Sequence, residues 1–327
     1  MNYSKLPKVE LHLHLDCSLS YDVVKHLNPS VTIEEYKHSF IAPPKCTDLA
    51  DYIKRSIKGF ELMQTKEQLR IVTLDVFKQL KEDNVVYAEI RFAPLLHISK
   101  GLSPEQVVEE VNKATNEGIE KYGIDAGIIL CTLRHYSEEQ SMGIVKLVDT
   151  YKGTHIVGFD IAADEAGFPI DNHINAFQFA KTNGIKCTAH AGEAKGPESV
   201  WETLENFYPS RIGHGVRSTE DDDLLAFLKA KKIHLEVCPT SNIQVNVFDK
   251  IEDHSANKIY NSGVSMSINT DCRTISNTTL NKEYHIMEQI FNWDRKYFKK
   301  CNLEAIKHSF ATEKIKKKIS VLIENAY

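Results

Sequence analysis

The stretch Val9-Glu10-Leu11-His12-Leu13-His14-Leu15-Asp16 carries two histidines that alternate with leucines at the end of an apolar run. Side chains repeat every second residue along a β-strand, so His12 and His14 project from one face of the predicted strand. Two imidazoles on one face can bind the same metal ion. The stretch therefore predicts a strand that ends at a metal site.

Three further polar clusters each follow another apolar, strand-like segment. They are His190-Ala191-Gly192-Glu193, Gly213-His214-Gly215 and Asn269-Thr270-Asp271. A single histidine is more often a structural residue than a ligand. Four histidines and an aspartate that all come at the ends of strands favour a common site instead.

Eight segments have the composition of buried parallel strands, which are apolar or β-branched on both faces. We predict strands at residues 9–14, 85–92, 126–132, 155–161, 186–190, 211–213, 233–237 and 264–269. Helical patterns lie between most of them, and the clearest begins at Ser103-Pro104 and ends near Gly123. This alternation predicts an α/β fold of the (β/α)8 TIM-barrel type, in which functional groups lie at the C-terminal ends of the strands.

Residues 15–84 are too many for one connection between the first two predicted strands. They contain helix-like stretches at 49–62 and 69–80, which we interpret as a helical cap beside the barrel mouth. Residues 1–327 would then form a single domain that includes this cap. The cap residues Leu49, Tyr52 and Ile53 have two open roles, lining the pocket or ordinary helix packing, and the pattern favours packing.

A later helix is predicted to begin near Ser218, because Asp221 three residues further on would complete a capping box. We interpret the run Asp221-Asp222-Asp223 as acidic residues that complement the dipole of this helix, and not as a metal or partner site.

The composition is typical of a globular protein, because 42% hydrophobic and 26% charged residues exclude a disordered chain. A formal net charge of −5 gives no electrostatic reason to expect nucleic acid or a membrane as partner. We find no signal-peptide core or spanning segment and expect a cytoplasmic protein. Seven cysteines without a C-x-x-C pair favour reduced, mostly buried thiols. The oligomeric state stays open.

Three imidazoles and one carboxylate form a donor set that suits zinc with an open position for water. We therefore predict that His12, His14, His190 and Asp271 bind one Zn²⁺ per chain. A second ion would usually need a bridging carboxylate or a modified lysine, and the predicted strand ending in Asp160-Ile161-Ala162-Ala163 has no lysine there.

Five motifs follow one another along the chain. They are His12-Leu13-His14-Leu15-Asp16, His190-Ala191-Gly192-Glu193, Arg211-Ile212-Gly213-His214-Gly215, Cys238-Pro239-Thr240-Ser241-Asn242 and Ser267-Ile268-Asn269-Thr270-Asp271. In this order they resemble the motifs of the adenosine deaminase family, over residues 5 to about 310. The resemblance implies zinc-dependent hydrolytic deamination of adenosine, and of 2′-deoxyadenosine, to inosine and ammonia, a reaction of purine salvage.

The resemblance implies catalytic roles for Glu193, His214 and Asp271. Asp271 would bind zinc and also orient the attacking water toward purine C6. His214 would accept the proton of that water and then stabilise the developing negative charge. Glu193, as a carboxylic acid, would protonate purine N1 and so make C6 electrophilic.

The same resemblance places His14, Asp16, Ala163 and Cys272 around the substrate. Asp16 would bind the ribose 5′-hydroxyl, and the backbone at Ala163 would lie along the purine edge near N3. Three positions depart from the family pattern: Cys17 and Ala163 replace glycines, and Cys272 replaces a second aspartate that meets purine N7. A thiol is a weaker hydrogen-bond donor, so Cys272 would hold N7 less firmly.

Two alternatives remain open. The protein could be a related deaminase that acts on adenine, a purine nucleotide or a modified adenine nucleoside, or it could be a non-catalytic binding protein on the same barrel. Asp16 and the lack of a phosphate-binding glycine loop favour an unphosphorylated, small-molecule purine nucleoside as the partner.

Overall fold

All eight predicted segments form strands in the computed structural model, which describes residues 3–327. The observed bounds agree with the predicted ones to within two residues at each end. The strands are β1 (Lys8–His14), β2 (Val85–Phe92), β3 (Asp125–Leu133), β4 (Ile156–Ala162), β5 (Thr188–Ala191), β6 (Arg211–His214), β7 (His234–Val237) and β8 (Ser265–Ile268).

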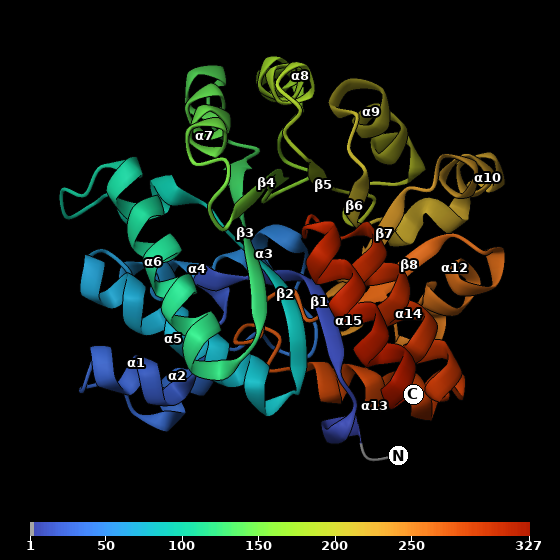
Figure 1. The fold of residues 1–327 in the computed structure, drawn as a ribbon, viewed down its shortest axis with the longest axis horizontal. Coiled ribbons are helices and arrows are strands. Elements are labelled where there is room, and N and C mark those ends of the chain that lie inside the picture. Colours follow the sequence, from blue (N-terminus) through green and yellow to red (C-terminus); the bar gives the residue numbers. More distant parts are fainter. Residues whose placement is uncertain (1–2) are drawn as a thin grey trace.

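The strands pair in parallel in two sheets, with the orders β1-β2-β3-β4 and β5-β6-β7-β8. Single bridges between Phe159 and Cys187 and between Leu13 and Asp271 connect the two sheets at both edges. Figure 1 shows the strands in the middle of the molecule with helices around them. The predicted α/β barrel class is confirmed, and its burial on both faces explains why the strands are apolar throughout.

Helices α5 to α15 follow one another around and beside the strands. No helix within residues 3–327 is both long enough and apolar enough to cross a membrane. These helices are α5 (Lys66–Glu82), α6 (Pro104–Tyr122), α7 (Glu138–Thr150), α8 (Ile174–Thr182), α9 (Pro197–Phe207), α10 (Asp222–Lys231), α11 (Pro239–Gln244), α12 (Ala256–Ser262), α13 (Leu280–Phe291), α14 (Arg295–His308) and α15 (Glu313–Ala326).

Helix α6 confirms the sequence prediction at both ends. Ser103 is its N-cap and forms a capping box with Gln106, and Gly123 ends it in the left-handed conformation with φ of 70°. Its buried residues include Val107, Val108, Val111 and Ala114, which repeat at the spacing of one helix face. The helix therefore packs on the barrel as its periodicity indicates.

The capping box predicted at Ser218 is wrong. Ser218 lies in a 3-10 turn (Val216–Glu220), and α10 begins only after it, with Asp221 as its N-cap. The Asp221 carboxylate accepts hydrogen bonds from the backbone N–H groups of Asp223 and Leu224, at 2.9 and 3.1 Å. An aspartate that directly precedes the first turn can satisfy two free N–H groups, so it starts the helix there.

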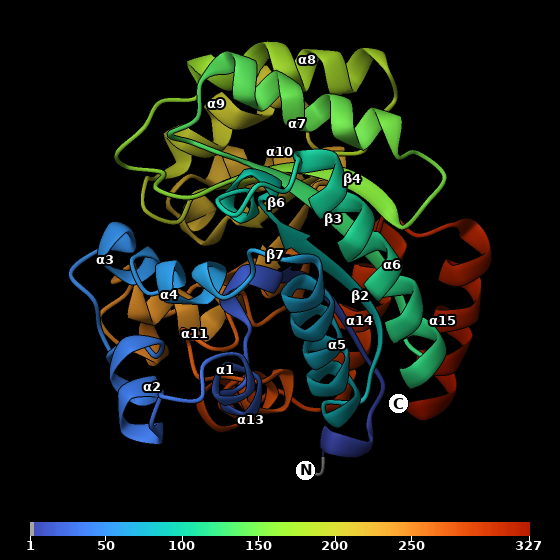
Figure 2. The same cartoon turned by 90° about the vertical axis from the view of Figure 1, so that its left-hand side faces the viewer.

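Between β1 and β2 lie four helices in addition to α5, namely α1 (Tyr21–Leu27), α2 (Ile33–Ser39), α3 (Leu49–Ile53) and α4 (Ser56–Glu61). They gather at the left of Figure 2. Helices α3 and α4 correspond to the stretch that we predicted as helical at 49–62. Helix α5 packs on α6 and contacts β2, so it takes the place of the crossover helix, and α1–α4 are the additional elements.

Candidate active site

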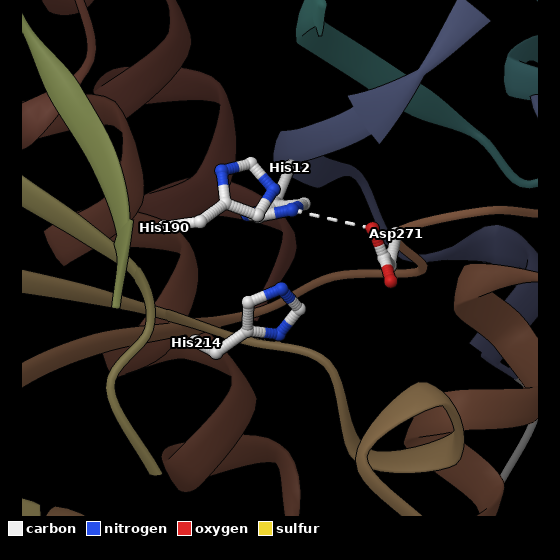
Figure 3. Close-up of side chains that lie close together, drawn as sticks. All are labelled: His12, His190, His214 and Asp271. Atoms are coloured by element: carbon white, nitrogen blue, oxygen red, sulfur yellow. Dashed lines mark ion pairs between the residues drawn. The ribbon is translucent and has the colours of Figure 1, made fainter. Parts of the chain in front are cut away.

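The polar clusters predicted at strand ends converge in space. His12 and His14 lie in the last part of β1, His190 lies in β5, His214 ends β6, and Asp271 follows β8. Four of these side chains, all but His14, face one another in Figure 3, and their potential ligand atoms lie within 4.8 Å of one another. His14 joins them through its own contacts with His190 and Asp271.

Three distances between donor atoms of the predicted zinc ligands match those of a tetrahedral site. Nε2 of His14 lies 3.2 Å from Nε2 of His190, and Oδ1 of Asp271 lies 3.3 Å from Nε2 of His12 and 3.4 Å from Nε2 of His14. Metal–ligand bonds of about 2.0–2.1 Å place neighbouring donors of a tetrahedron about 3.3–3.4 Å apart. The residues present therefore fit a zinc-like cation.

Two buried carboxylates orient the histidines toward this centre. Nδ1 of His12 donates to Oε2 of Glu236 at 2.9 Å, and Nδ1 of His190 lies 3.1 Å from Oδ2 of Asp160. Because a carboxylate only accepts, Nδ1 carries the proton and Nε2 keeps a free lone pair. Arg91 donates to both carboxylates, at 2.8 Å to Asp160 and 2.6 Å to Glu236, and compensates their charge.

The protonation states of His14, His190 and His214 also suit metal binding and proton transfer. Burial lowers the pKa of His14 to about 3, and it lowers the pKa of His190 below the ordinary value. Burial, followed by the neighbouring His12, lowers the pKa of His214 well below the ordinary value. Neutral imidazoles bind metal ions and accept protons, so these three side chains are in the required form.

Glu193 lies beside this centre as a buried carboxyl group. Asn242 Nδ2 donates to its Oε1 at 2.7 Å, and Nδ1 of His214 lies 3.3 Å from the same oxygen. Burial, followed by the negative charges of Asp271 and Glu165, raises the pKa of Glu193 well above the ordinary value. The raised pKa favours the protonated form of the side chain, which can act as an acid.

Glu165 fixes the turn that carries Glu193. Its carboxylate accepts hydrogen bonds from the backbone N–H groups of Gly192 at 2.7 Å and of Glu193 at 3.0 Å. Gly192 has φ of 69°, and an added Cβ would lie 2.5 Å from a methyl group of Val200. The turn thus needs a glycine at position 192, for both its conformation and its packing.

Three site residues other than glycine have left-handed backbone conformations. Their φ values are 80° for Ala163, 62° for His214 and 61° for Asp271. Such conformations cost free energy in residues with a side chain and persist only where the surrounding structure enforces them. Each of the three residues follows or ends a strand, so these left-handed conformations occur at the mouth of the barrel, where the site residues lie.

A cavity of about 360 Å³ opens beside the metal-binding centre. It is lined by His14, Asp16, Ala163 and Cys272, together with Glu193 and His214. Cap residues from α3 and α4 also line it, so of the two roles considered for them the structure has the less favoured one, pocket lining. These cap residues include Leu49, Tyr52, Ile53, Ile57 and Phe60.

Comparison with known proteins agrees with this geometry. A family model described as adenosine deaminase matches residues 7–326. The chain belongs to the adenosine deaminase family. It is 35% identical over 318 residues to an adenosine deaminase of Clostridium acetobutylicum, with 95% of each chain covered. This family membership makes the chain a hydrolytic deaminase and its chemistry metal-dependent.

Solved structures share the fold of this adenosine deaminase family member. An adenine deaminase of Arthrobacter aurescens superposes with a TM-score of 0.90 at 24% identity, covering 98% of both chains. An amidohydrolase of Burkholderia ambifaria with bound zinc superposes with a TM-score of 0.91 at 20% identity, covering 99% of this chain and 91% of that one.

Sequence reasoning on this deaminase missed the groups that support the site. Ser241 donates to Oδ2 of Asp271 at 2.6 Å, and Asn242 contacts Glu193 and His214. Both residues belong to a motif that carries the family resemblance, so that motif was the available signal. Glu236 and Asp160 carried another signal, because each is the one acidic residue of a buried strand.

Proposed function

We propose that this protein is a zinc-dependent adenosine deaminase that converts adenosine, and 2′-deoxyadenosine, to inosine and ammonia. The observation that carries the proposal is a set of three donor–donor distances that match a tetrahedral zinc site, next to Glu193, a buried carboxyl group with a raised pKa. A cavity of about 360 Å³ lies within the size range of small-molecule sites and adjoins both groups.

His12, His14, His190 and Asp271 would hold one Zn²⁺ per chain. When bound, zinc lowers the pKa of water so that hydroxide is available near neutral pH. Asp271 in addition accepts a hydrogen bond from the attacking water and directs it toward C6. Ser241 keeps the other oxygen of this carboxylate in place through its 2.6 Å hydrogen bond.

Glu193 supplies the proton that activates the purine. Oε1 of Glu193 already accepts a hydrogen bond from Asn242, so the acidic proton belongs on Oε2, from which it passes to purine N1. Protonation at N1 draws electron density from C6 and favours attack there. It also gives the tetrahedral adduct a route to release ammonia.

His214 accepts a proton from the attacking water. Its Nδ1 lies 3.2 Å from Nδ2 of Asn242, which leaves the other ring nitrogen for the reaction. The imidazole is neutral before the reaction and becomes cationic as it takes the proton. The imidazolium then stabilises the negative charge that develops on the oxygen at C6.

The pocket favours an unphosphorylated nucleoside. Asp16 is a buried carboxylate in the lining, where it can accept a hydrogen bond from the ribose 5′-hydroxyl and would repel a phosphate. Within the described residues, Lys54 at the rim is the one lysine or arginine of the lining. The backbone at Ala163 and the thiol of Cys272 complete the surface that receives the base.

We further propose that residues 1–327 form one catalytic domain in which helices α1–α4 of the segment 15–84 are the cap, and that the enzyme acts in the cytoplasm. The cap side chains that line the cavity support the first proposal. All seven cysteines are unpaired, which supports a reducing compartment.

Formation of the 6-oxopurine product by purified, zinc-analysed protein tests the function, because N6-methyladenosine would release methylamine in place of ammonia. We expect one zinc per chain and the highest kcat/KM with adenosine in a panel that also contains 2′-deoxyadenosine, adenine, AMP and N6-methyladenosine. If adenine, AMP or N6-methyladenosine gave a higher kcat/KM than adenosine, that compound and not adenosine would be the preferred substrate. Absence of turnover with every compound after zinc loading would identify a non-catalytic binding protein.

A further inference from the structure

His97 is a buried histidine that faces Asp16, the carboxylate proposed to bind the ribose 5′-hydroxyl. It ends the 3-10 helix Pro94–His97 that follows β2, and its side chain is fully buried. Its Nε2 lies 3.8 Å from Oδ2 of Asp16 and has no hydrogen-bond partner within residues 3–327. A buried polar atom without a hydrogen bond requires an explanation, and the carboxylate opposite it provides one.

The other ring nitrogen fixes the orientation of His97. Nδ1 lies 3.1 Å from the carbonyl oxygen of Met63, just after helix α4 of the cap. A carbonyl oxygen only accepts, so Nδ1 carries a proton and donates it. Gln64 holds the same two segments together, because its Nε2 donates to the carbonyl oxygen of Leu96 at 2.8 Å. These bonds keep Nε2 of the ring on the side of Asp16.

The two oxygens of the Asp16 carboxylate have different surroundings. Oδ2 accepts a hydrogen bond from the backbone N–H group of Ala93 at 3.4 Å and also faces His97. Oδ1 lies 3.7 Å from Sγ of Cys17, and a thiol is a weak donor. Asp16 lines the substrate cavity. Oδ2 is therefore the oxygen by which the protein holds the carboxylate, and Oδ1 is the oxygen available to a hydroxyl group of the substrate.

The contact between His97 and Asp16 is attractive only if Nε2 carries a proton. A carboxylate repels the lone pair of a neutral ring nitrogen and attracts a protonated one. Because Nδ1 already carries a proton, a second proton on Nε2 makes the ring an imidazolium ion. A separation of 3.8 Å lies within the range of an ion pair, and the burial of both side chains limits its screening by water.

We propose that His97, protonated on both ring nitrogens, is a positioning residue for Asp16 and thereby determines the preference for a nucleoside with a free 5′-hydroxyl group. Its positive charge holds Oδ2, so that Oδ1 can accept the hydrogen bond from the 5′-hydroxyl. His97 is not part of the cavity lining, so it acts on the substrate through Asp16. The inference rests on the proposed function and adds to it the residue that supports recognition of the ribose.

Kinetics with adenosine and 5′-deoxyadenosine test the proposal. The second compound lacks the hydroxyl group that Asp16 is proposed to bind, so the ratio of the two kcat/KM values isolates this contact from the chemistry at C6. We expect the wild type to prefer adenosine about 10- to 100-fold, the range for a hydrogen bond to a charged group.

Two amide substitutions separate the roles of the two ring nitrogens. The amide nitrogen of asparagine can take the place of Nδ1, and that of glutamine the place of Nε2. His97→Asn keeps a donor for Met63 but none for Asp16, so the preference for adenosine should fall about fivefold or more. His97→Gln keeps a donor for Asp16, and its preference should stay within about twofold of the wild-type value. In the Asp16→Ala background, His97→Asn should cause no further loss of preference.

His173→Asn is the matched control. His173 is equally buried, and its two ring nitrogens contact Oγ of Ser141 and the carbonyl oxygen of Arg134, each at 3.1 Å. Its replacement should change both kcat/KM values by the same factor. Nitrogen NMR of wild-type protein with isotopically labelled histidine gives a second readout. We expect both ring nitrogens of His97, identified by the signals lost in a folded His97 variant, to be protonated.

Three kinetic outcomes would overturn the proposal: a wild type that does not prefer adenosine, a His97→Asn variant that keeps the preference, or a His97→Gln variant that loses as much of it as His97→Asn. A neutral His97 ring in the NMR spectrum would overturn it as well. If the wild type deaminated neither compound, the proposed function would fail, and the NMR spectrum would still test the state of the ring.

Discussion

Oε2 of Glu236 lies 2.9 Å from Nδ1 of His12, although Glu236 comes from β7 and His12 from β1, two strands that are not hydrogen-bonded to each other. The contact crosses the interior of the barrel. Glu236 also accepts hydrogen bonds from Arg91 and Arg211, each at 2.6 Å. The carboxylate is therefore ionised and positioned to fix the imidazole that faces the metal-binding centre.

Replacing this carboxylate should weaken metal binding. In Glu236→Gln the hydrogen bond to His12 loses its ionic partner, and we expect metal affinity to fall about 10- to 100-fold. Competition with a chelator measures the affinity directly. Glu283→Gln is the control, because Glu283 is equally buried and accepts its hydrogen bonds from Thr240 and Thr278. Equal metal affinities in the two variants would show that Glu236 does not position a metal ligand.

Glu193→Gln should separate catalysis from metal binding. An amide cannot give a proton to purine N1, so we expect kcat to fall about 10²- to 10⁴-fold, while the metal content stays at that of the wild type. Steady-state kinetics and elemental analysis on the same preparation provide both readouts. Glu202→Gln, on the exposed side of α9, should keep full activity. Turnover of Glu193→Gln at the wild-type rate would refute its role as the acid.

Gly213→Ala should disturb the metal-binding centre through packing alone. A Cβ at this position would lie 2.9 Å from Cε1 of His12 and 3.3 Å from Cα of His190. The hydrogen bond with Glu236 restrains His12, so we expect the ring to be displaced and metal affinity to fall at least tenfold. In Gly143→Ala, by contrast, the new methyl group meets nothing within 4 Å in helix α7.

The control variant should be neutral or more stable by up to about 1 kcal/mol, because alanine is a better helix former than glycine. Chelator competition compares the metal affinities of both glycine variants, and urea unfolding compares their stabilities. Unchanged metal affinity in Gly213→Ala would show that the barrel interior has room for the added methyl group.

Glu283 should make stability depend on pH. Burial raises the pKa of this carboxyl group from 4.5 to about 7. The folded chain therefore keeps a proton that the unfolded chain loses above about pH 4.5, and the free energy of unfolding should fall as pH rises to 7 and beyond. The full loss is up to about 3 kcal/mol, since one pKa unit corresponds to about 1.4 kcal/mol.

Urea unfolding at pH 5 and pH 8 measures the change in stability across the pH range in which Glu283 loses its proton. The wild type should lose more stability between the two values than Glu283→Gln, whose amide does not titrate. Parallel losses in both proteins would mean that Glu283 has the same pKa in the folded and the unfolded chain.

The barrel and the convergence of its polar clusters were predictable because both follow from local patterns. Apolar runs of four to nine residues separated by helices indicate parallel strands, and parallel strands bring their C-terminal ends to one rim. His12, His190 and Asp271 could therefore be placed together although they are far apart in the chain. The position of Asp221 as a cap was missed, because the more distant Ser218 matched a capping pattern equally well.

The carboxylates that orient the histidines of the site were not predictable in the same way. Asp160 and Glu236 are single charges inside apolar strands, and nothing in their neighbourhood in the sequence identifies the histidine that each one holds. The role of the cap residues was equally hard to predict from the sequence, because the pattern of Leu49, Tyr52 and Ile53 is that of any amphipathic helix. Which side of α3 faces the cavity depends on how the segment 15–84 folds back over the barrel.

The sequence by itself determined the strands, the order of the polar clusters and the chemical types of the groups at the barrel mouth, because these depend on residue type and on the spacing of neighbours along the chain. The tertiary structure alone decided which carboxylate holds which histidine and which cap residues line the cavity. These contacts join segments distant in the sequence, and their distances are set by the packing of the whole barrel.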